Sequence, residues 1–323
     1  MYRRFLVAAS LALGALPFAT FAQQSYPSKP IKFIVPYAPG GLPDTVARVV
    51  AKQLGERLGQ SVVVDNRPGG NGVVAYQTLL NSTPDDGHAF IVSDGSMLSI
   101  TPLVNKAANY QVGKDILPVA LIARSPLFVV AHPKTGVNNF KEFVSLVKSK
   151  PDQLTYGSSG IGSTHHLTME ALKVALNLDV RHVPYRGSGQ STPALVGGQT
   201  DFSIAALPSV MGFIKTNQVR LLASNAPNRS AQAPDIPTIA ETVPGFDFSV
   251  VVGVLAAAGT PQAAIDRISK EIAEAVKSPE VAKTFEAAVI DAVGAGPAEY
   301  ARVISRENEL MAKAGKAANL KAE

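Results

Sequence analysis

Short apolar runs alternate with amphipathic segments along most of the chain. The run at 31–36 (IKFIVP) is typical of a buried strand, and residues 44–58 repeat their apolar positions at helical spacing before Gly59, a favoured residue at a helix C-terminus. The same alternation predicts a strand at 61–66, a helix at 73–81 and a strand at 88–94. Strands joined through helices by short connections indicate parallel pairing and right-handed crossovers. This part of the chain is therefore predicted to form an α/β lobe.

A second series of the same kind begins near residue 124. It predicts strands at 127–133, 153–159, 180–185, 201–207 and 219–225, with helices at 140–150, 163–177, 189–198 and 210–218 between them. A strand at 251–259 and helices beginning near Pro261, Pro279 and Pro297 follow. The chain is expected to cross between the lobes in single strands near 118–130 and 216–225. We therefore predict an α/β fold of two lobes, 26–123 with 221–323 and 124–220, joined by a two-strand hinge around a ligand cleft.

The first 22 residues have the layout of a cleaved export signal. Arg3 and Arg4 precede an uncharged apolar stretch, and the small-residue site Thr20-Phe21-Ala22 ends it. A membrane anchor is the alternative, but Pro17 interrupts the stretch, which is short for a span. Residues 1–22 are therefore predicted to be a signal peptide, which places the mature protein in the periplasm.

Composition narrows the function further. The 30 basic residues, less the two arginines of the signal, stand against 25 acidic residues, and no dense basic run is interleaved with aromatics, so nucleic-acid binding is not expected. The absence of cysteine excludes disulfides, thiol catalysis and Cys-ligated zinc. With no HExxH pattern either, we expect no metal site and no cofactor.

The loop VPYAPGGLPD (35–44) connects the first predicted strand to the first helix. Gly40 and Gly41 allow close backbone approach, the prolines stiffen the loop, and Asp44 is the expected N-cap of the helix. The free N–H groups of a helix N-terminus favour an anion such as a carboxylate or phosphate. A plain strand-to-helix turn is the alternative for this loop. It contains no P-loop pattern.

A second glycine-rich loop, TYGSSGIGSTHHL (155–167), lies at another strand-to-helix junction. Its glycines free the backbone, and its serines and Thr164 add hydroxyl donors. It lacks the third glycine and the following acidic residue of the dinucleotide fingerprint, so a second anion-binding helix start is the better interpretation.

Other candidates have plain alternatives. Ser93 and Ser96 follow a strand and suit a ligand or an ordinary turn, and Tyr185 and Arg186 end a strand near the expected cleft, where Arg186 suits a ligand carboxylate or solvent. No G-x-S-x-G pattern is present, and His165 is expected to line the cleft or bond locally rather than to catalyse. We therefore expect no enzyme activity.

Several blocks in order carry a resemblance over the whole mature chain. They include YPSKPIKFIVPYAPGGLPDTVAR, LGQSVVVDNRPGGNG, TPDDGHAFIV, YGSSGIGSTHHL, HVPYRGSGQ and LVGGQTDFSI. The chain resembles a Bug-type periplasmic solute-binding protein of the tripartite tricarboxylate transporter family. The resemblance implies a two-lobed, type II-like periplasmic binding fold without catalysis, in which loops of both lobes hold an organic carboxylate. It also implies a membrane permease as the partner, and we expect a monomer.

The resemblance places the ligand grips on 37–41 with Asp44, on 158–160 and on 163–165. Together with the other candidates, the predicted ligand-binding residues are Tyr37, Ala38, Pro39, Gly40, Gly41, Asp44, Ser93, Ser96, Ser158, Ser159, Gly160, Ser163, Thr164, His165, Tyr185 and Arg186. The ligand is expected to be an aliphatic or aromatic mono- or dicarboxylate such as terephthalate, or a tricarboxylate. A sensor that signals to a membrane kinase, and an exported hydrolase that uses Ser163 or Ser159 with His165, remain alternatives.

Overall fold

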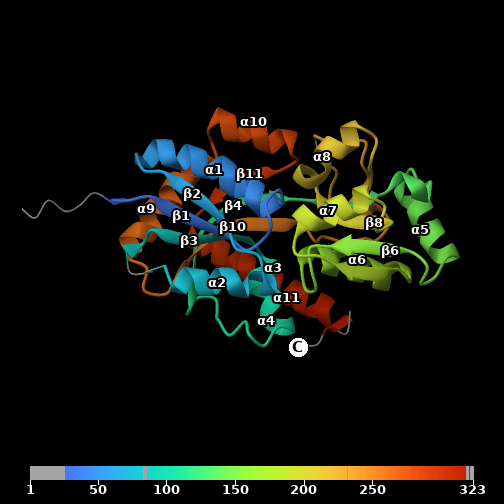
Figure 1. Ribbon diagram of the computed structural model, residues 1–323, viewed down its shortest axis with the longest axis horizontal. Coiled ribbons are helices and arrows are strands. Elements are labelled where there is room, and N and C mark those ends of the chain that lie inside the picture. The colour runs from blue at the N-terminus through green and yellow to red at the C-terminus, as the bar shows by residue number, and fades with distance from the viewer. Residues whose placement is uncertain (1–25, 83–85, 231, 318–319, 321–323) are drawn as a thin grey trace, which may run out of the picture.

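The helices and strands form two lobes that lie side by side (Figure 1). The computed structural model describes residues 26–82, 86–230, 232–317 and 320. Within these residues, the sheet of the first lobe has six strands in the order β11-β4-β10-β3-β1-β2, and the sheet of the second lobe has five in the order β7-β6-β8-β5-β9. The predicted signal peptide, 1–22, lies outside the described residues.

The strands of the first lobe are β1 (Ile31–Val35), β2 (Val62–Asn66), β3 (Ala89–Asp94), β4 (Ile116–Ser125), β10 (Val250–Ala257) and β11 (Asp291–Ala295). Those of the second lobe are β5 (Leu127–Ala131), β6 (Thr155–Ser158), β7 (Arg181–Pro184), β8 (Phe202–Ala206) and β9 (Arg220–Ser224). The predicted boundaries between the lobes, 123/124 and 220/221, fall inside β4 and β9.

The helices of the first lobe are α1 (Leu42–Leu58), α2 (Val73–Leu80), α3 (Ser96–Ser99), α4 (Thr101–Val104), α9 (Gln262–Ala275), α10 (Pro279–Ala287) and α11 (Pro297–Ala317). Those of the second lobe are α5 (Phe140–Ser149), α6 (Thr164–Leu176), α7 (Ser188–Val196) and α8 (Leu207–Lys215). Short 3-10 helices lie at Gly70–Gly72, Pro133–Thr135 and Ile239–Glu241.

Strand pairing explains how the loops reach one edge of each sheet. β1 runs parallel to β2 and β3, and β6 runs parallel to β7 and β8. The carboxyl ends of these parallel strands therefore lie together, and the chain leaves them through the two glycine-rich loops. β10 is antiparallel to both β3 and β4, and β5 is antiparallel to both β8 and β9.

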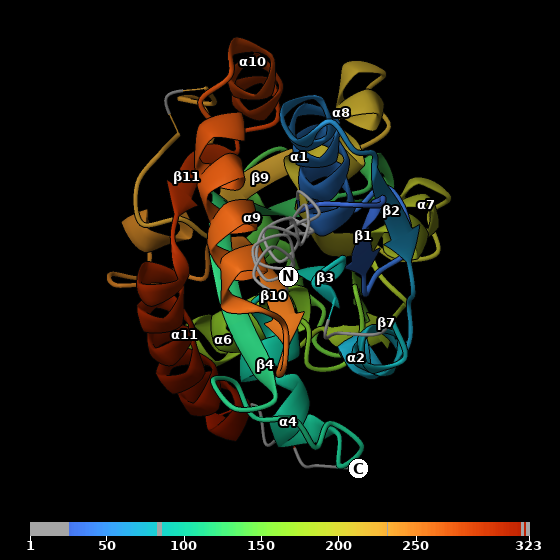
Figure 2. The same cartoon turned by 90° about the vertical axis from the view of Figure 1, so that its left-hand side faces the viewer.

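Alternation along β1 places helices on both faces of the first sheet. Phe33 and Val35 belong to a buried cluster with Val46 and Val50 of α1, whereas Ile34 belongs to a separate cluster with α2 residues. Because successive strand side chains point to opposite faces, both faces of β1 must be covered, and every residue but Lys32 is fully buried. Figure 2 shows α1 and α9 on one side of this sheet and α2 and α11 on the other.

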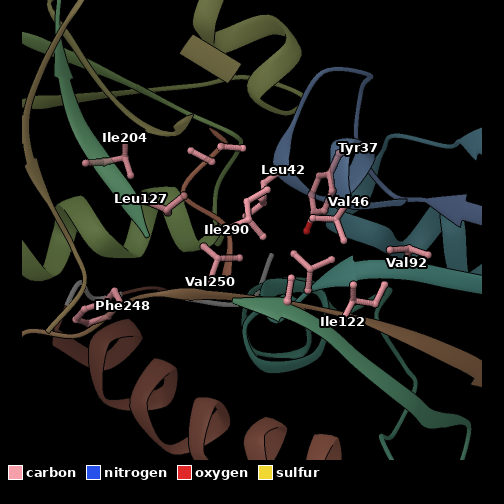
Figure 3. Packing of buried hydrophobic residues seen from close by; sticks show 14 of the residues in the cluster. Tyr37, Leu42, Val46, Val92, Ile122, Leu127, Ile204, Phe248, Val250 and Ile290 are labelled. Atoms are coloured by element: carbon pink, nitrogen blue, oxygen red, sulfur yellow. The ribbon is translucent and has the colours of Figure 1, made fainter. Parts of the chain in front are cut away.

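The chain crosses between the lobes at two neighbouring points. β4 continues into β5 through Pro126, and β9 leads through Asn225 towards β10. Asn225 is fully buried and ties the crossings together: its side chain accepts from the Leu127 N–H (2.8 Å) and donates to the Phe248 carbonyl (2.6 Å). One buried cluster runs through this junction, from Leu42 of α1 to Ile204 of β8 (Figure 3).

Three features differ from the sequence-based expectation. Helix α1 begins at Leu42 with Gly41 as N-cap, so Asp44 lies in its first turn and is not the N-cap. Pro43 is tolerated in the first turn because the N–H that proline lacks would have no hydrogen-bond acceptor within the helix at that position. Strand β11 and the short helices α3 and α4 were not predicted.

Among the described residues, each helix is too short or too polar to cross a bilayer.

Candidate functional site

The first-lobe loop, Tyr37–Gly41, is held by the Asp44 carboxylate. Asp44 is 3% exposed and accepts hydrogen bonds from the Gly40 N–H (2.9 Å), the Asn66 amide (2.9 Å) and the Arg48 guanidinium (3.1 Å). Burial acts to raise the pKa of Asp44, but these hydrogen bonds and the Arg48 charge outweigh it and hold the pKa below its ordinary value. The carboxylate therefore stays ionised and fixes the loop. Gly40 needs its glycine because its φ is +89°.

Tyr37 anchors the same loop from beneath. Its hydroxyl lies 2.7 Å from Asp94 Oδ1 and 2.8 Å from Ser96 Oγ, and its ring lies beside Val46 (Figure 3). Asp94 also accepts from the Ser96 N–H (3.0 Å) and the Ser96 hydroxyl. Burial is the main cause that raises the pKa of Asp94 above its usual range, although these hydrogen bonds oppose it. The predicted residues Tyr37 and Ser96 thus meet in one buried network, with fully buried Ser93 at the end of β3 nearby.

The second-lobe loop, Ser158–Ser163, ends in a well-formed helix start. Ser163 is the N-cap of α6: its hydroxyl accepts from the His166 N–H (3.2 Å) and donates to the Gly160 carbonyl (2.8 Å). The N–H groups of Thr164 and His165 then have no earlier carbonyl of the helix to bind. They point, with the positive end of the helix dipole, to the place where the loop turns.

A chain of neutral donors lies beside this helix start. The hydroxyls of Ser159 and Ser188 are 3.0 Å apart, and Ser188 Oγ is 3.3 Å from His165 Nε2. Burial lowers the pKa of His165 to about 4, so its imidazole is uncharged at neutral pH. Its Nδ1 is buried and has no hydrogen-bond partner among the described residues. The neutral His165 side chain can therefore offer a ligand a hydrogen bond but no positive charge to balance a carboxylate.

The first-lobe loop meets the second lobe at the starts of α7 and α8. Ser209 of α8 donates to the Gly40 carbonyl (3.2 Å). A Cβ added to Gly189 would lie 2.4 Å from the Pro39 carbonyl oxygen, and one added to Gly187 would lie 3.3 Å from the Ala38 nitrogen. The start of α7 therefore packs directly on the first-lobe loop. Ser188 connects this contact to the start of α6, because it lies 3.9 Å from a Cβ added to Gly41 and its hydroxyl lies near Ser159 and His165.

The remaining predicted residues lie at its margin. The Tyr185 ring packs near Gly157, because a Cβ there would be 3.4 Å from Tyr185 Cε2. Arg186 is exposed, and only its backbone N–H bonds locally, to the Gln190 side chain (3.2 Å). Within the described ranges, His, Asp and Glu side chains form no group of three that would hold a metal ion.

Two lobes joined by paired crossings, each with a glycine-rich loop that leads into a helix start, define a periplasmic binding protein fold. The family model described as the tripartite tricarboxylate transporter family receptor matches residues 46–320. The chain belongs to this family, and its Bug-type character is supported by BugT from Bordetella pertussis, which is 32% identical over 270 residues, 83% of each chain.

Solved structures agree in fold. Rpa4515 of R. palustris with adipate superposes with a TM-score of 0.88 at 29% identity, covering 92% of this chain and 100% of that one. MatC of Rhodopseudomonas palustris with bound malate gives a TM-score of 0.82 at 26% identity, covering 90% of this chain and 99% of that one. These neighbours are binding proteins for small carboxylates.

Sequence reasoning did not select four residues that shape the site: Asp94, Ser188, Gly189 and Ser209. Asp94 lies inside the SDGS stretch that supplied Ser93 and Ser96. A buried aspartate at the end of a strand next to a predicted ligand loop is a signal that would have found it. Ser188, Gly189 and Ser209 have no such signal, because their role depends on how the second lobe packs on the first.

Proposed function

We propose that this protein is an exported receptor that binds a small organic carboxylate between the Tyr37–Gly41 and Ser158–His165 loops. Ser188 at the start of α7 carries the proposal, because it lies beside Gly41 of the first-lobe loop and its hydroxyl lies 3.0 Å from that of Ser159 and 3.3 Å from His165 Nε2. It thus connects the starts of α1 and α6, whose backbone N–H groups suit a carboxylate. Adipate in one neighbour and malate in another favour an aliphatic dicarboxylate. Delivery of the ligand to a membrane permease, residence in the periplasm and the monomeric state belong to the same proposal.

Asp44 and Tyr37 act mainly as supports in this proposal. Their polar atoms are already bonded to Gly40, Asn66 and Asp94. Because the Gly40 carbonyl is also bonded, to Ser209, the ligand would use the backbone N–H groups of Ala38 and Gly41. In the second lobe, Ser159, Thr164 and His165 would face the carboxylate. Ser93, Tyr185 and Arg186 would line the margin.

Binding without catalysis is supported by the state of His165. A serine hydrolase needs a histidine that is oriented by a third group on its other nitrogen. His165 Nδ1 has no such partner within the described residues, and the Ser163 hydroxyl bonds to the Gly160 carbonyl and the His166 N–H. A hydrolase would turn over model esters and lose that activity in Ser163→Ala. Signalling to a membrane kinase would use the same binding event and requires a pull-down to detect.

The test is a thermal-shift and isothermal titration screen of residues 23–323 against mono-, di- and tricarboxylates, including adipate, malate and terephthalate. A ligand several hundred-fold above its Kd should stabilise the protein by about 3–4 kcal/mol. No binding to any organic acid by a folded protein would refute the proposal.

Substitutions at Gly41 locate the site. A Cβ at this position meets Pro43 and Ser188 only at 3.9 Å, so Gly41→Ala fits, whereas the branched side chain of Gly41→Val extends into the contact between the lobes. We expect Gly41→Val to abolish most binding and Gly41→Ala to retain most of it. Arg186→Ala will weaken binding only if that exposed side chain reaches the ligand. Equal, negligible losses in all three would mean that the ligand binds elsewhere.

A further inference from the structure

Three aromatic rings stack beneath the second-lobe loop. The His182 ring of β7 lies between the His166 ring of α6 (centroids 4.1 Å apart, interplanar angle 13°) and the Tyr156 ring of β6 (4.8 Å, 20°). Neither His166 nor His182 is among the residues predicted to bind the ligand. Both rings are nevertheless bonded to the loop that does.

Each imidazole holds one end of that loop. His182 Nε2 is 2.6 Å from the hydroxyl of Ser158, the first loop residue. At the other end, the Gly162 N–H donates to His166 Nδ1 (3.1 Å). The two imidazoles therefore hold the beginning and the end of the loop through hydrogen bonds.

The bond to Ser158 continues to the helix start. The Ser158 hydroxyl accepts from the Gly160 N–H (3.1 Å), and the Gly160 carbonyl accepts from both the backbone N–H (3.1 Å) and the hydroxyl of Ser163, the N-cap. Gly160 has a φ of +128°, which a residue with a side chain rarely adopts. An unusual backbone shape thus depends on a short series of bonds that starts at His182.

Both imidazoles are uncharged. Burial is the main cause that lowers the pKa of His182 to about 3, with smaller electrostatic contributions from His166 and Lys173, and burial is also the main cause that lowers the pKa of His166. Glu170 Oε1 lies 4.0 Å from His166 Nε2, but it is already bonded to the Tyr156 hydroxyl (2.7 Å) and Lys173 (2.9 Å). Nδ1 of His166 must be unprotonated to accept from Gly162, so a neutral ring is required there.

We propose that the stacked pair His166 and His182 positions the Ser158–Ser163 loop for carboxylate binding without touching the ligand. This role rests on the proposed function of the loop. The rings act through their hydrogen bonds to Ser158 and Gly162.

Substitutions at His182 separate its hydrogen bond from its ring. His182→Phe keeps the stack but loses the bond to Ser158, and His182→Gln keeps a polar group within reach of Ser158 but loses the stack. With adipate and malate as probes, we expect His182→Phe to weaken binding by at least tenfold and His182→Gln to stay within about threefold of the wild type. Ser158→Ala should match His182→Phe, and the double variant should be no weaker than either single variant.

A matched control comes from His132 in the same lobe. Its Nδ1 also accepts a backbone N–H, that of Lys134 (3.0 Å), but at a 3-10 turn away from the loop. His132→Gln should leave binding unchanged. Wild-type affinity in His182→Phe, or losses that simply multiply in the double variant, would overturn the proposal.

Hydrogen exchange of the ligand-free protein tests the loop itself. In His182→Phe, the Gly160 amide should exchange at least tenfold faster while amides of the β5 and β8 core stay unchanged, and His182→Gln should restore the slow rate. If exchange responds in this way and no carboxylate binds, the positioning role stands and the proposed function fails. If carboxylates bind and exchange at Gly160 does not respond, the positioning role is wrong.

Discussion

Gly189 offers a substitution that should act on lobe closure alone. It lies in the first turn of α7, where an added Cβ would be 2.4 Å from the Pro39 carbonyl oxygen and 3.3 Å from Ala38 Cβ. Both of these neighbours belong to the other lobe. When the lobes separate, the Cβ of Gly189→Ala has open space in place of this contact, so the clash exists only in the closed arrangement.

The size of the effect follows from the overlap. Carbon and carbonyl oxygen approach to roughly 3.3 Å at closest, so the loops would have to move apart by about 1 Å. Overpacking of this kind costs about 1–3 kcal/mol. If ligand binding requires the closed arrangement, affinity should fall by roughly 5- to 150-fold, since about 1.4 kcal/mol corresponds to a factor of ten.

Isothermal titration with adipate and malate measures the affinity, and urea unfolding without ligand measures the fold. We expect Gly189→Ala to lose affinity with its free energy of unfolding within about 1 kcal/mol of the wild type. Gly212→Ala is the control: Gly212 lies on α8 of the same lobe, and an added Cβ there meets nothing within 4 Å. If Gly189→Ala binds the ligand as tightly as the wild type does, ligand binding does not require the contact of Gly189 with Pro39 and Ala38 between the lobes.

Three further substitutions test buried polar groups, each by urea unfolding. Burial raises the pKa of Glu307 to about 8, with a contribution from Asp94, so between pH 4.5 and 7 the unfolded chain releases a proton that the folded chain keeps. The stability that Glu307 contributes is fully present below pH 4.5 and declines as pH rises. The free energy of unfolding of the wild type, compared with that of Glu307→Gln, should therefore fall by about 3 kcal/mol between pH 4.5 and pH 7. A difference between the two proteins that is constant with pH would contradict this. Tyr37→Phe removes the hydroxyl bonded to Asp94 and should cost about 1–3 kcal/mol and also weaken ligand binding; unaltered stability and affinity would show that the anchor is dispensable. Asn225→Ala leaves the Leu127 N–H at the crossing without its acceptor and should lower the free energy of unfolding by about 2–3 kcal/mol. A smaller change than in the exposed control Asn138→Ala would show that the Asn225 side chain does not stabilise the crossing.

The regular elements were readable from the sequence because their signals are local. The apolar run that forms β1 and the helical periodicity of α1 gave elements within two residues of the observed bounds at most ends. The failure at the start of α1 has a local cause as well. An aspartate three residues into a helix bonds back to the loop, here to the Gly40 N–H, and this arrangement resembles an N-cap in sequence.

Strand β11 could not be predicted in this way. Its sequence, DAVGA, is short, Val293 is its only large apolar residue, and its first three residues are exposed. The strand exists because it pairs with the edge of β4, far away in the chain: Asp291 opposes Arg124 and Ala292 opposes Ala123. Pairing of that kind depends on tertiary structure and leaves no periodic pattern.

The candidate site likewise contains residues that the local sequence predicts and residues that only tertiary packing brings together. Glycine-rich loops between an apolar run and an amphipathic segment predicted both helix starts. Ser188, Ser209 and the His166–His182 pair acquire their roles only when α7, α8 and β7 are brought to those loops. Sequence spacing gives no measure of such contacts.

The chemistry of the two loops also bears on which ligands can close the lobes. Each helix start offers backbone N–H groups, and the start of α6 adds serine hydroxyls and the neutral, buried His165, so a carboxylate gains hydrogen bonds without a full counter-charge. A ligand shifts the closed state only by the interactions that it makes there and not in the open state. A carboxylate bound by one lobe alone adds nothing to closure. A ligand whose polar groups contact both the 38–41 backbone and the start of α6 gains the second set of bonds only when the lobes meet, and this favours acids with a second carboxylate or hydroxyl over simple monocarboxylates.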